Sequence, residues 1–184
     1  MKRLVLAAGL VAALAVGALL YVSESSPPWY ERLRYPLRHA TLLREQAREK
    51  GLDPALLAAV IYQESKFRAD ARSSTGAIGL MQLQPETAKG IALRTGGTAF
   101  RVSDLENPEI NVRYGAWYLQ HLFEKYEDER LVLAAYNAGQ GHVDRWLENG
   151  QEIQFPETRA YVTRVAGLKT VYREAWRSEL YGPG

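Results

Sequence analysis

The stretch "VIYQESKFRADARSSTGAIGLMQ", Val60–Gln82, places a single acidic residue, Glu64, inside an apolar helical pattern. Leu57, Val60 and Ile61 recur at the spacing of one helical face, which we expect to point into a core. Glu64 extends that face by one turn. Burial at the edge of an apolar face should raise the pKa of a carboxyl group. A carboxylic acid that stays protonated near neutral pH is what general-acid catalysis requires.

An ordinary explanation of Glu64 stays open at this point. The last turn of the helix could leave the core, so that the carboxylate reaches water or pairs with Lys66 or Arg68. A functional interpretation therefore needs support from the residues that follow.

The segment "SSTGAIGLMQ" after this helix combines small polar residues with two glycines, Gly76 and Gly79. Glycine permits positive φ and lets the backbone approach a ligand closely. Gln82 adds a side chain that both donates and accepts hydrogen bonds, which suits the amides and hydroxyls of a sugar. The segment could also be an ordinary loop whose glycines only serve turn geometry.

The rest of the chain predicts helices and almost no strand alternation. Asp53-Pro54 and Asn107-Pro108 combine an N-cap residue with proline at the first helical position. Glycines after Lys50 and Leu93 mark helix ends. We expect helices over residues 37–50, 54–65, 85–93, 108–126, 131–136, 143–147 and 156–178. The pattern indicates an all-α domain with one core, spanning residues 37–184.

The N-terminal segment "MKRLVLAAGLVAALAVGALLYV" contains nineteen residues, Leu4–Val22, without a charge. A bilayer core of ~30 Å needs about 20 helical residues, so residues 1–22 predict a membrane anchor. A cleaved signal segment and a buried helix of the domain are the alternatives. Lys2 and Arg3 precede the apolar run, which places the following domain on the outer face of the cytoplasmic membrane. Residues 23–36 then read as a linker, extended at least through the two prolines.

Composition excludes several classes of function. The chain has 23 basic and 21 acidic residues, and without Lys2 and Arg3 the two counts are equal. A neutral domain gives no electrostatic basis for nucleic-acid binding. The chain has no cysteine and only three histidines, whose spacing fits neither a metal site nor a Ser-His-Asp triad. We therefore expect no metal and no cofactor.

Four blocks, taken together, resemble the lysozyme-like lytic transglycosylases of the soluble-lytic-transglycosylase (SLT) type. The blocks are "AVIYQES", "SSTGAIGLMQLQPETA", "LAAYNAGQG" and "PETRAYV". The resemblance covers about Leu52 to Val171, and it implies a single lysozyme-like domain of the goose or SLT type. One departure is Gln84, where many relatives have methionine, which affects a detail of sugar packing rather than the chemistry.

The resemblance implies that Glu64 is the only catalytic acid and then the base. It would protonate the oxygen that links N-acetylmuramic acid to N-acetylglucosamine in peptidoglycan, and then take the proton of the muramyl 6-hydroxyl as a 1,6-anhydro ring closes. Substrate-assisted schemes of this kind are known exceptions to the two-carboxylate rule of glycosidases. The resemblance also implies a set of substrate-binding residues: Ser73, Gly79, Leu80, Met81, Gln82, Tyr136, Asn137, Glu157 and Tyr161.

Two other functions remain open. A hydrolase of goose-lysozyme character would use the same acid with water as the acceptor, and Asp70, Glu86 or Glu109 could position that water. A non-catalytic glycan-binding module would not require Glu64 at all. Within the resemblance, Tyr136 could simply pack in the core, and Glu157 could be an ordinary helix-start carboxylate.

Overall fold

The computed structural model describes residues 16–17 and 27–182, and the chain divides into two compact units, Met1–Pro36 and Leu37–Gly184. In the first unit, helix α2 (Pro28–Arg34) occupies part of the expected linker, because the extended Pro27 allows Pro28 to begin a helix. Apart from Val16 and Gly17, the expected anchor lies outside the described residues. Among the described helices, none combines the length and apolarity needed to cross a bilayer.

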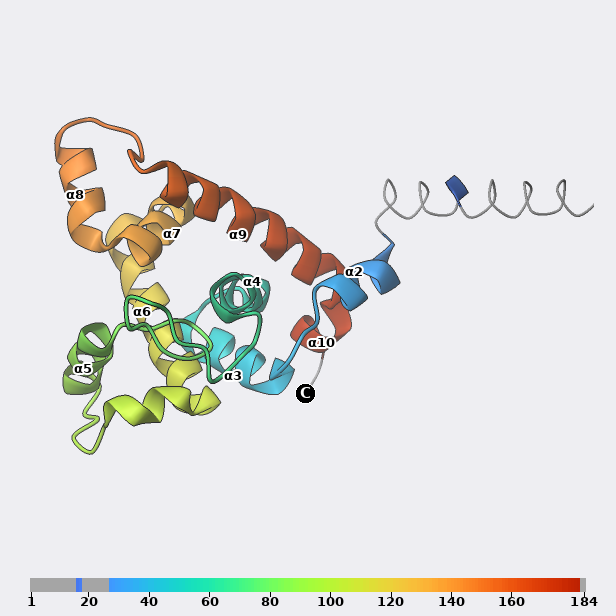
Figure 1. The fold of residues 1–184 in the computed structure, drawn as a ribbon, viewed down its shortest axis with the longest axis horizontal. Coiled ribbons are helices and arrows are strands. Elements are labelled where there is room, and N and C mark those ends of the chain that lie inside the picture. Colours follow the sequence, from blue (N-terminus) through green and yellow to red (C-terminus); the bar gives the residue numbers. More distant parts are fainter. Residues whose placement is uncertain (1–15, 18–26, 183–184) are drawn as a thin grey trace, which may run out of the picture. The chain divides into compact units, whose positions relative to one another are not determined.

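In its described part, the regular elements of the second unit are all helices, as expected for an all-α domain (Figure 1). Its elements, in chain order, are α3 (Ala40–Lys50), α4 (Pro54–Ser65), α5 (Pro85–Arg94), the 3-10 helix η1 (Val102–Glu106), α6 (Pro108–Tyr126), α7 (Glu129–Ala138), α8 (Gln140–Glu148), α9 (Pro156–Ala175) and α10 (Arg177–Tyr181).

Proline opens four of these helices, as the sequence predicts. Pro54, Pro85, Pro108 and Pro156 each stand in the first turn. The pyrrolidine ring presets the helical φ, and its missing N–H would have no partner at this position. At two of the starts, a side-chain oxygen of Asp53 or Asn107 accepts main-chain N–H groups of the first turn. Local chemistry therefore sets where these helices begin.

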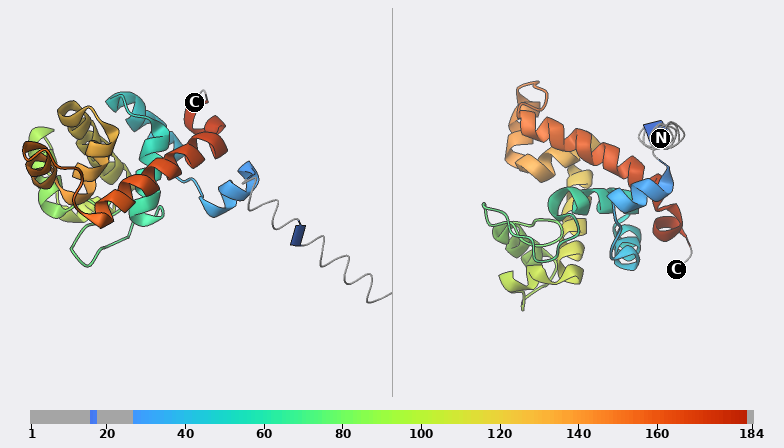
Figure 2. Two further views of the ribbon diagram at one scale, coloured as in Figure 1. Left: turned by 90° about the horizontal axis from the view of Figure 1, so that it is seen from above. Right: turned by 45° about the vertical axis from the view of Figure 1, so that its right-hand side comes forward.

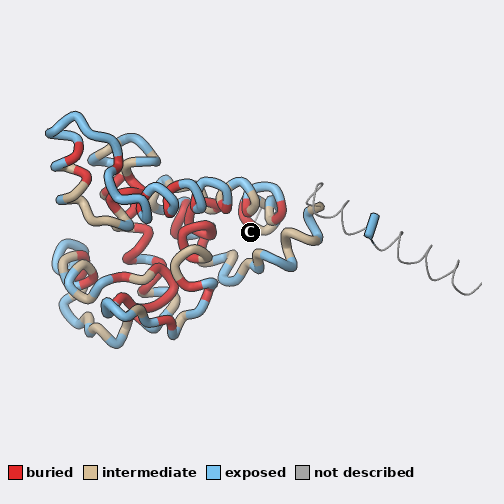
Figure 3. The backbone as a smooth tube through the Cα atoms, turned by 45° about the horizontal axis from the view of Figure 1, so that its top comes forward, coloured by how far each residue is buried: buried red, intermediate tan, exposed pale blue. Residues whose placement is uncertain are grey.

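Helix α4 forms the centre of the second unit. The seven residues from Ala55 to Ile61 are all buried, including those opposite the face predicted to be apolar. α4 packs most extensively against α9, and also contacts α3 and α10. The left view of Figure 2 shows α9 crossing α4, and Figure 3 shows the burial of α4 within the unit. A helix that is packed on all sides is held in place, so the residues at its two ends are held in place as well.

The structure differs from the prediction at the C-terminal end and in one connection. A single helix was expected from residue 156 to 178, but α9 ends at Ala175 and α10 follows after Trp176. The 3-10 helix η1 was not expected. Helices α7 and α8 are both longer than predicted, because Asp128 caps α7 and Gly139 joins the two helices directly.

Candidate active site

Glu64 lies in the last turn of α4, one residue before the helix ends at Ser65. Lys66 closes the helix in the left-handed conformation, and Phe67 repeats that conformation before the chain enters the following loop. The Glu64 side chain therefore leaves the buried helix at its C-terminal end. The partial negative charge of a helix C-terminus disfavours an ionised carboxylate there.

The carboxyl group of Glu64 is hydrogen-bonded to a tyrosine of α9. The Tyr161 hydroxyl donates to Glu64 Oε1 at 2.7 Å, and Tyr161 itself is buried. Burial raises the pKa of Glu64 to about 7, although the Tyr161 hydrogen bond and the positive charge of Lys66 act in the opposite direction. Desolvation therefore dominates the titration of this group. The solvated alternative for Glu64, including pairing with Lys66 as an ordinary surface ion pair, does not describe this environment.

The loop after α4 is held against the end of that helix. The Ser65 hydroxyl lies 2.8 Å from the Leu80 carbonyl and 3.1 Å from the Ile61 carbonyl. The loop also folds back on itself through isolated bridges that pair Ile78 with Arg72 and with Leu83. These contacts keep the residue next to Glu64 attached to the loop that faces it.

Gln82 uses its side chain inside this loop. Its Nε2 donates to the carbonyls of Ala71 (3.0 Å) and Gly79 (2.9 Å), and its φ of 47° is left-handed. The amide nitrogen of Gln82 therefore helps to fix the shape of the loop. Gln82 holds the loop closed at its far end.

Asn111 of α6 organises the same loop, and the sequence analysis missed it. Its Oδ1 accepts the Met81 N–H at 2.7 Å, and its Nδ2 donates to the carbonyls of Ile78 and Leu105, both at 2.9 Å. Asn111 is fully buried, so these three bonds satisfy main-chain groups that would otherwise be buried without partners. The available signal was a polar residue on the apolar face of a helix.

Gly79 is required where Asn111 meets the loop. Its φ is 83°, and a Cβ at this position would collide with the Asn111 amide and the Leu105 carbonyl. Gly115, one turn after Asn111, leaves room for the Met81 side chain in the same way. The glycine of the loop thus serves close packing of backbone against α6.

Tyr136 of α7 is also hydrogen-bonded to this loop. Its hydroxyl donates to the Met81 carbonyl at 2.7 Å, and its ring packs on Tyr118 with centroids 5.6 Å apart. Burial raises the pKa of Tyr136 well above its usual value, with the nearby charge of Glu64 as a second cause. Tyr136, Met81 and Glu64 therefore belong to one connected cluster.

The other predicted site residues lie at differing degrees of exposure. Leu80 and Met81 are fully buried, main chain included, and their carbonyls accept hydrogen bonds from Ser65 and Tyr136. Ser73 is half-buried, and its hydroxyl accepts the Ala77 N–H within the loop. Asn137 is exposed and accepts a hydrogen bond from the buried Thr158 at 2.8 Å. Glu157 is exposed in the first turn of α9, one turn before Tyr161.

The chemistry available here is that of one carboxyl group. A group with a pKa near 7 can give a proton and take one back at neutral pH. Among the described residues, no carboxylate shifts the pKa of Glu64. The same residues contain no cluster of three or more His, Cys, Asp or Glu side chains that could hold a metal ion. The candidate second carboxylates Asp70, Glu86 and Glu109 are all exposed, and Glu86 is paired with Lys89 at 2.7 Å.

Comparison with known proteins identifies one family. Residues 41–157 match the family described as "Transglycosylase SLT domain". The chain is 34% identical over 152 residues to the soluble lytic murein transglycosylase of Salmonella typhimurium, covering 76% of this chain and 24% of that protein. It is 43% identical over 99 residues to the membrane-bound lytic murein transglycosylase F of Yersinia enterocolitica, covering 50% of this chain and 18% of that protein.

Solved structures agree with these matches. An inactive mutant of the lytic transglycosylase Slt from Pseudomonas aeruginosa superposes with a TM-score of 0.75 at 33% identity, over 94% of this chain and 30% of that chain. The 70 kDa soluble lytic transglycosylase of Escherichia coli gives a TM-score of 0.73 at 31% identity, over 78% and 25% of the respective chains. The chain thus spans about a quarter of the length of the soluble relatives it matches.

Proposed function

Because the chain belongs to the family of transglycosylase SLT domains, we propose that it is a peptidoglycan lytic transglycosylase with Glu64 as its single acid and base. Protonated Glu64 gives its proton to the glycosidic oxygen between N-acetylmuramic acid and N-acetylglucosamine, and the bond from that oxygen to muramyl C1 breaks. The substrate's N-acetyl oxygen stabilises the cationic C1. Glu64, now ionised, takes the proton of the 6-hydroxyl as O6 bonds to C1, which closes the 1,6-anhydro ring and consumes no water.

The environment of Glu64 is the observation that carries this proposal. Its pKa of about 7 means that both the proton-giving and the proton-taking form are accessible at neutral pH. The Tyr161 hydroxyl holds Oε1 at 2.7 Å and stabilises the ionised form after the first transfer. One side chain can therefore serve both halves of the reaction without being replaced.

Among the described residues, no carboxylate contributes to the pKa of Glu64, which favours ring closure over hydrolysis. Glycosidases that follow the two-carboxylate rule place the second group ~5–9.5 Å from the first, as nucleophile or as base for water. In the described part of the chain, the only charged side chain that acts on the pKa of Glu64 is Lys66. The 6-hydroxyl of the substrate would then act as the nucleophile, and Glu64 would be the only protein base that this step needs.

The remaining site residues are proposed to hold the glycan around Glu64. The side chains of Ser73, Gln82, Tyr136 and Asn137 would contact the sugars, and the buried Gly79, Leu80 and Met81 would shape the loop behind them. Tyr161 would act through Glu64, and Glu157 would lie at the rim of the same site. We further propose that residues 4–22 tether the domain to the outer face of the cytoplasmic membrane. An intact-mass measurement of membrane-fraction protein tests the tether, since loss of about twenty N-terminal residues would refute it.

Digestion of purified peptidoglycan, followed by mass spectrometry of the released muropeptides, tests the reaction. The proposal expects anhydro-muropeptides, each one water lighter than the hydrolysis product. Reducing-end muropeptides would instead assign a goose-lysozyme-like hydrolase. No release from peptidoglycan that the protein still binds would assign a non-catalytic binding module. The Glu148→Gln variant is the matched control for Glu64→Gln, because Glu148 is an exposed glutamate of the same length and is not a candidate second carboxylate.

A further inference from the structure

A cavity of about 210 Å³ lies between α5, α6 and the start of α8. Its wall includes Glu86 and Arg94 from opposite ends of α5, Trp117 and Tyr118 from α6, and Gln140 from α8. The cavity is smaller than the ~300–1,000 Å³ typical of sites for drug-sized ligands. It therefore suits one or two small units of a longer molecule.

The cavity is connected to the candidate active site through two tyrosines. Tyr118 forms part of its wall and packs against Tyr136, with ring centroids 5.6 Å apart. Tyr136 in turn binds the Met81 carbonyl, and its titration responds to the charge of Glu64. Tyr118 and Tyr136 thus form a packed pair between the wall of the cavity and the loop beside Glu64.

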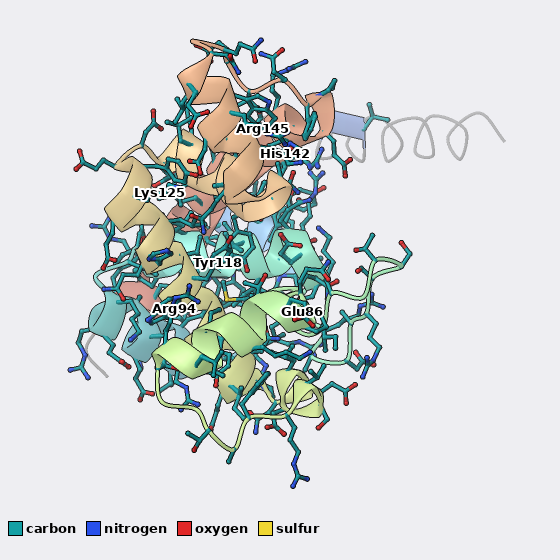
Figure 4. All side chains as sticks on the ribbon, turned by 90° about the vertical axis from the view of Figure 1, so that its left-hand side faces the viewer. Glu86, Arg94, Tyr118, Lys125, His142 and Arg145 are labelled. Atoms are coloured by element: carbon teal, nitrogen blue, oxygen red, sulfur yellow. The ribbon has the colours of Figure 1, made fainter. Side chains whose placement is uncertain are left out.

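Arg94 gives the cavity a positive group with free hydrogen-bond donors. Its Nη1 donates to the Gly90 carbonyl at 3.0 Å, one turn back on α5. No described carboxylate lies within ion-pair distance of Arg94, whereas Glu86 at the other end of α5 is neutralised by Lys89 at 2.7 Å. Figure 4 shows Tyr118 between α5, which carries Glu86 and Arg94, and α8, which carries His142 and Arg145.

We propose that this cavity binds the stem peptide of the peptidoglycan strand, with Arg94 pairing to a carboxylate of that peptide. This inference rests on the proposed function, because it takes peptidoglycan as the substrate. A guanidinium presents paired donors that match a carboxylate, and the stem peptide is the part of peptidoglycan that carries free carboxylates. The glycan itself offers hydroxyls and neutral amides, which do not need an unpaired arginine.

The rest of the wall fits a peptide as well. Tyr118, Gln140 and the Thr87 hydroxyl supply hydrogen-bonding groups for peptide amides. Trp117 supplies an apolar surface, although His121 stacks on its ring at 5.3 Å. A site with a few polar groups around an aromatic surface orients its ligand rather than merely attracting charge.

The first test compares two substrates: glycan strands with unmodified stem peptides, and the same strands after the carboxylates of the stem peptides have been converted to amides. The readout is the ratio of kcat/KM for the two substrates in the full-length protein. We expect Arg94→Ala to lower this ratio about tenfold, the value of one lost charge-assisted hydrogen bond. Arg48→Ala, which removes an exposed arginine of α3, should keep the wild-type ratio. An unchanged ratio in Arg94→Ala, including an equal loss on both substrates, would overturn the proposal.

The second test does not depend on catalysis. Titration of a free stem peptide into full-length Glu64→Gln should give saturable binding in the millimolar range, and Glu64→Gln combined with Arg94→Ala should lose it. Equal binding to both proteins, or none to either, would overturn the inference about the cavity. If the wild-type enzyme releases no product but the peptide still binds through Arg94, the proposed reaction fails and the peptide site stands.

Discussion

Asp53 caps the start of α4 and Glu64 stands in its last turn, so the same helix has a carboxyl group at each end. Each carboxyl group also accepts a hydrogen bond from a tyrosine hydroxyl, Tyr181 for Asp53 and Tyr161 for Glu64. Their pKa values nevertheless move in opposite directions. Burial raises the pKa of both, but at Asp53 the hydrogen bonds of Tyr181, Arg173 and the Ala55 N–H outweigh it.

The difference lies in what else surrounds each group. At the N-terminal end, Asp53 has two cations, Arg173 and Lys169, and the positive end of the helix dipole. At the C-terminal end, Glu64 has one tyrosine, a more distant Lys66 and the negative end of the dipole. A carboxyl group surrounded by donors stabilises the fold, whereas one short of donors keeps its proton and is available for chemistry.

The largest expected effect is the loss of catalysis in Glu64→Gln. Removing the proposed acid and base should reduce the rate of anhydro-muropeptide release by about 10³-fold or more, because both proposed proton transfers depend on it. The initial rate on purified peptidoglycan, with circular dichroism to verify folding, measures this. Glu148→Gln should stay within a few-fold of wild type. A Glu64→Gln variant that keeps most of its activity would contradict the role given to this end of α4.

At the opposite end, Asp53→Ala should cost stability rather than catalysis. It removes an N-cap and two partly exposed ion pairs, together about 2 kcal/mol of unfolding free energy at neutral pH. Since the pKa of Asp53 is lowered on folding, its charge-dependent contribution is present above the ordinary pKa and is lost as the pH falls below it. Urea denaturation measures the loss, with the exposed Asp70→Ala as control. A fall in activity without a fall in stability would reverse the comparison.

Glu64→Gln should also make the protein more stable at alkaline pH. The folded pKa of about 7 lies above the ordinary value of 4.5, so the folded state releases its proton later than the unfolded chain. Stability of the wild type should therefore fall between those two pH values and stay lower above them. We expect the variant to gain roughly 1–2 kcal/mol at about pH 8 and to match wild type at about pH 4. Equal stability at both pH values would show that Glu64 titrates normally.

The smallest expected effect is a shifted pH profile in Tyr161→Phe. The lost hydrogen bond had stabilised the ionised carboxylate, so the pKa of Glu64 should rise further, by about one unit. The alkaline limb of kcat/KM would move to higher pH by the same amount, because the acid stays protonated longer. Tyr181→Phe, which removes the equivalent tyrosine at Asp53, should change stability and leave the profile in place. A shift to lower pH in Tyr161→Phe would contradict the assigned direction.

Sequence predicted the helix starts well where a proline marks them, since that signal is local, whereas the starts of α3, α7 and α8 were predicted two or three residues away. Asp53-Pro54 and Asn107-Pro108 are cap and first-turn residues in the structure, because capping and proline geometry involve only neighbouring residues. The break at Trp176 carries no glycine or proline, and the sequence analysis missed it. Burial of α4 on every face was also underestimated, because helical periodicity shows one apolar face and not what covers the others.

The site was predictable where a residue conflicted with its own surroundings. Glu64 stood out against its apolar helix, and its raised pKa follows that prediction. Asn111 gave a similar signal on α6 but was not recognised, since its three partners lie 6 to 33 residues away in the chain. The inward direction of the Leu80 and Met81 side chains depends on how the loop folds against α6, which no local pattern specifies.

The close fit of Gly79 against Asn111 restricts how this sequence can change over generations. Any side chain at position 79 meets the Asn111 amide, and any shorter residue at 111 leaves the main-chain groups of Ile78, Met81 and Leu105 without partners. Neither position can be replaced first without loss, so single substitutions do not lead to an alternative pair. A change in the loop beside Glu64 therefore requires two coordinated substitutions, whereas an exposed position such as Arg48 carries no packing constraint of this kind.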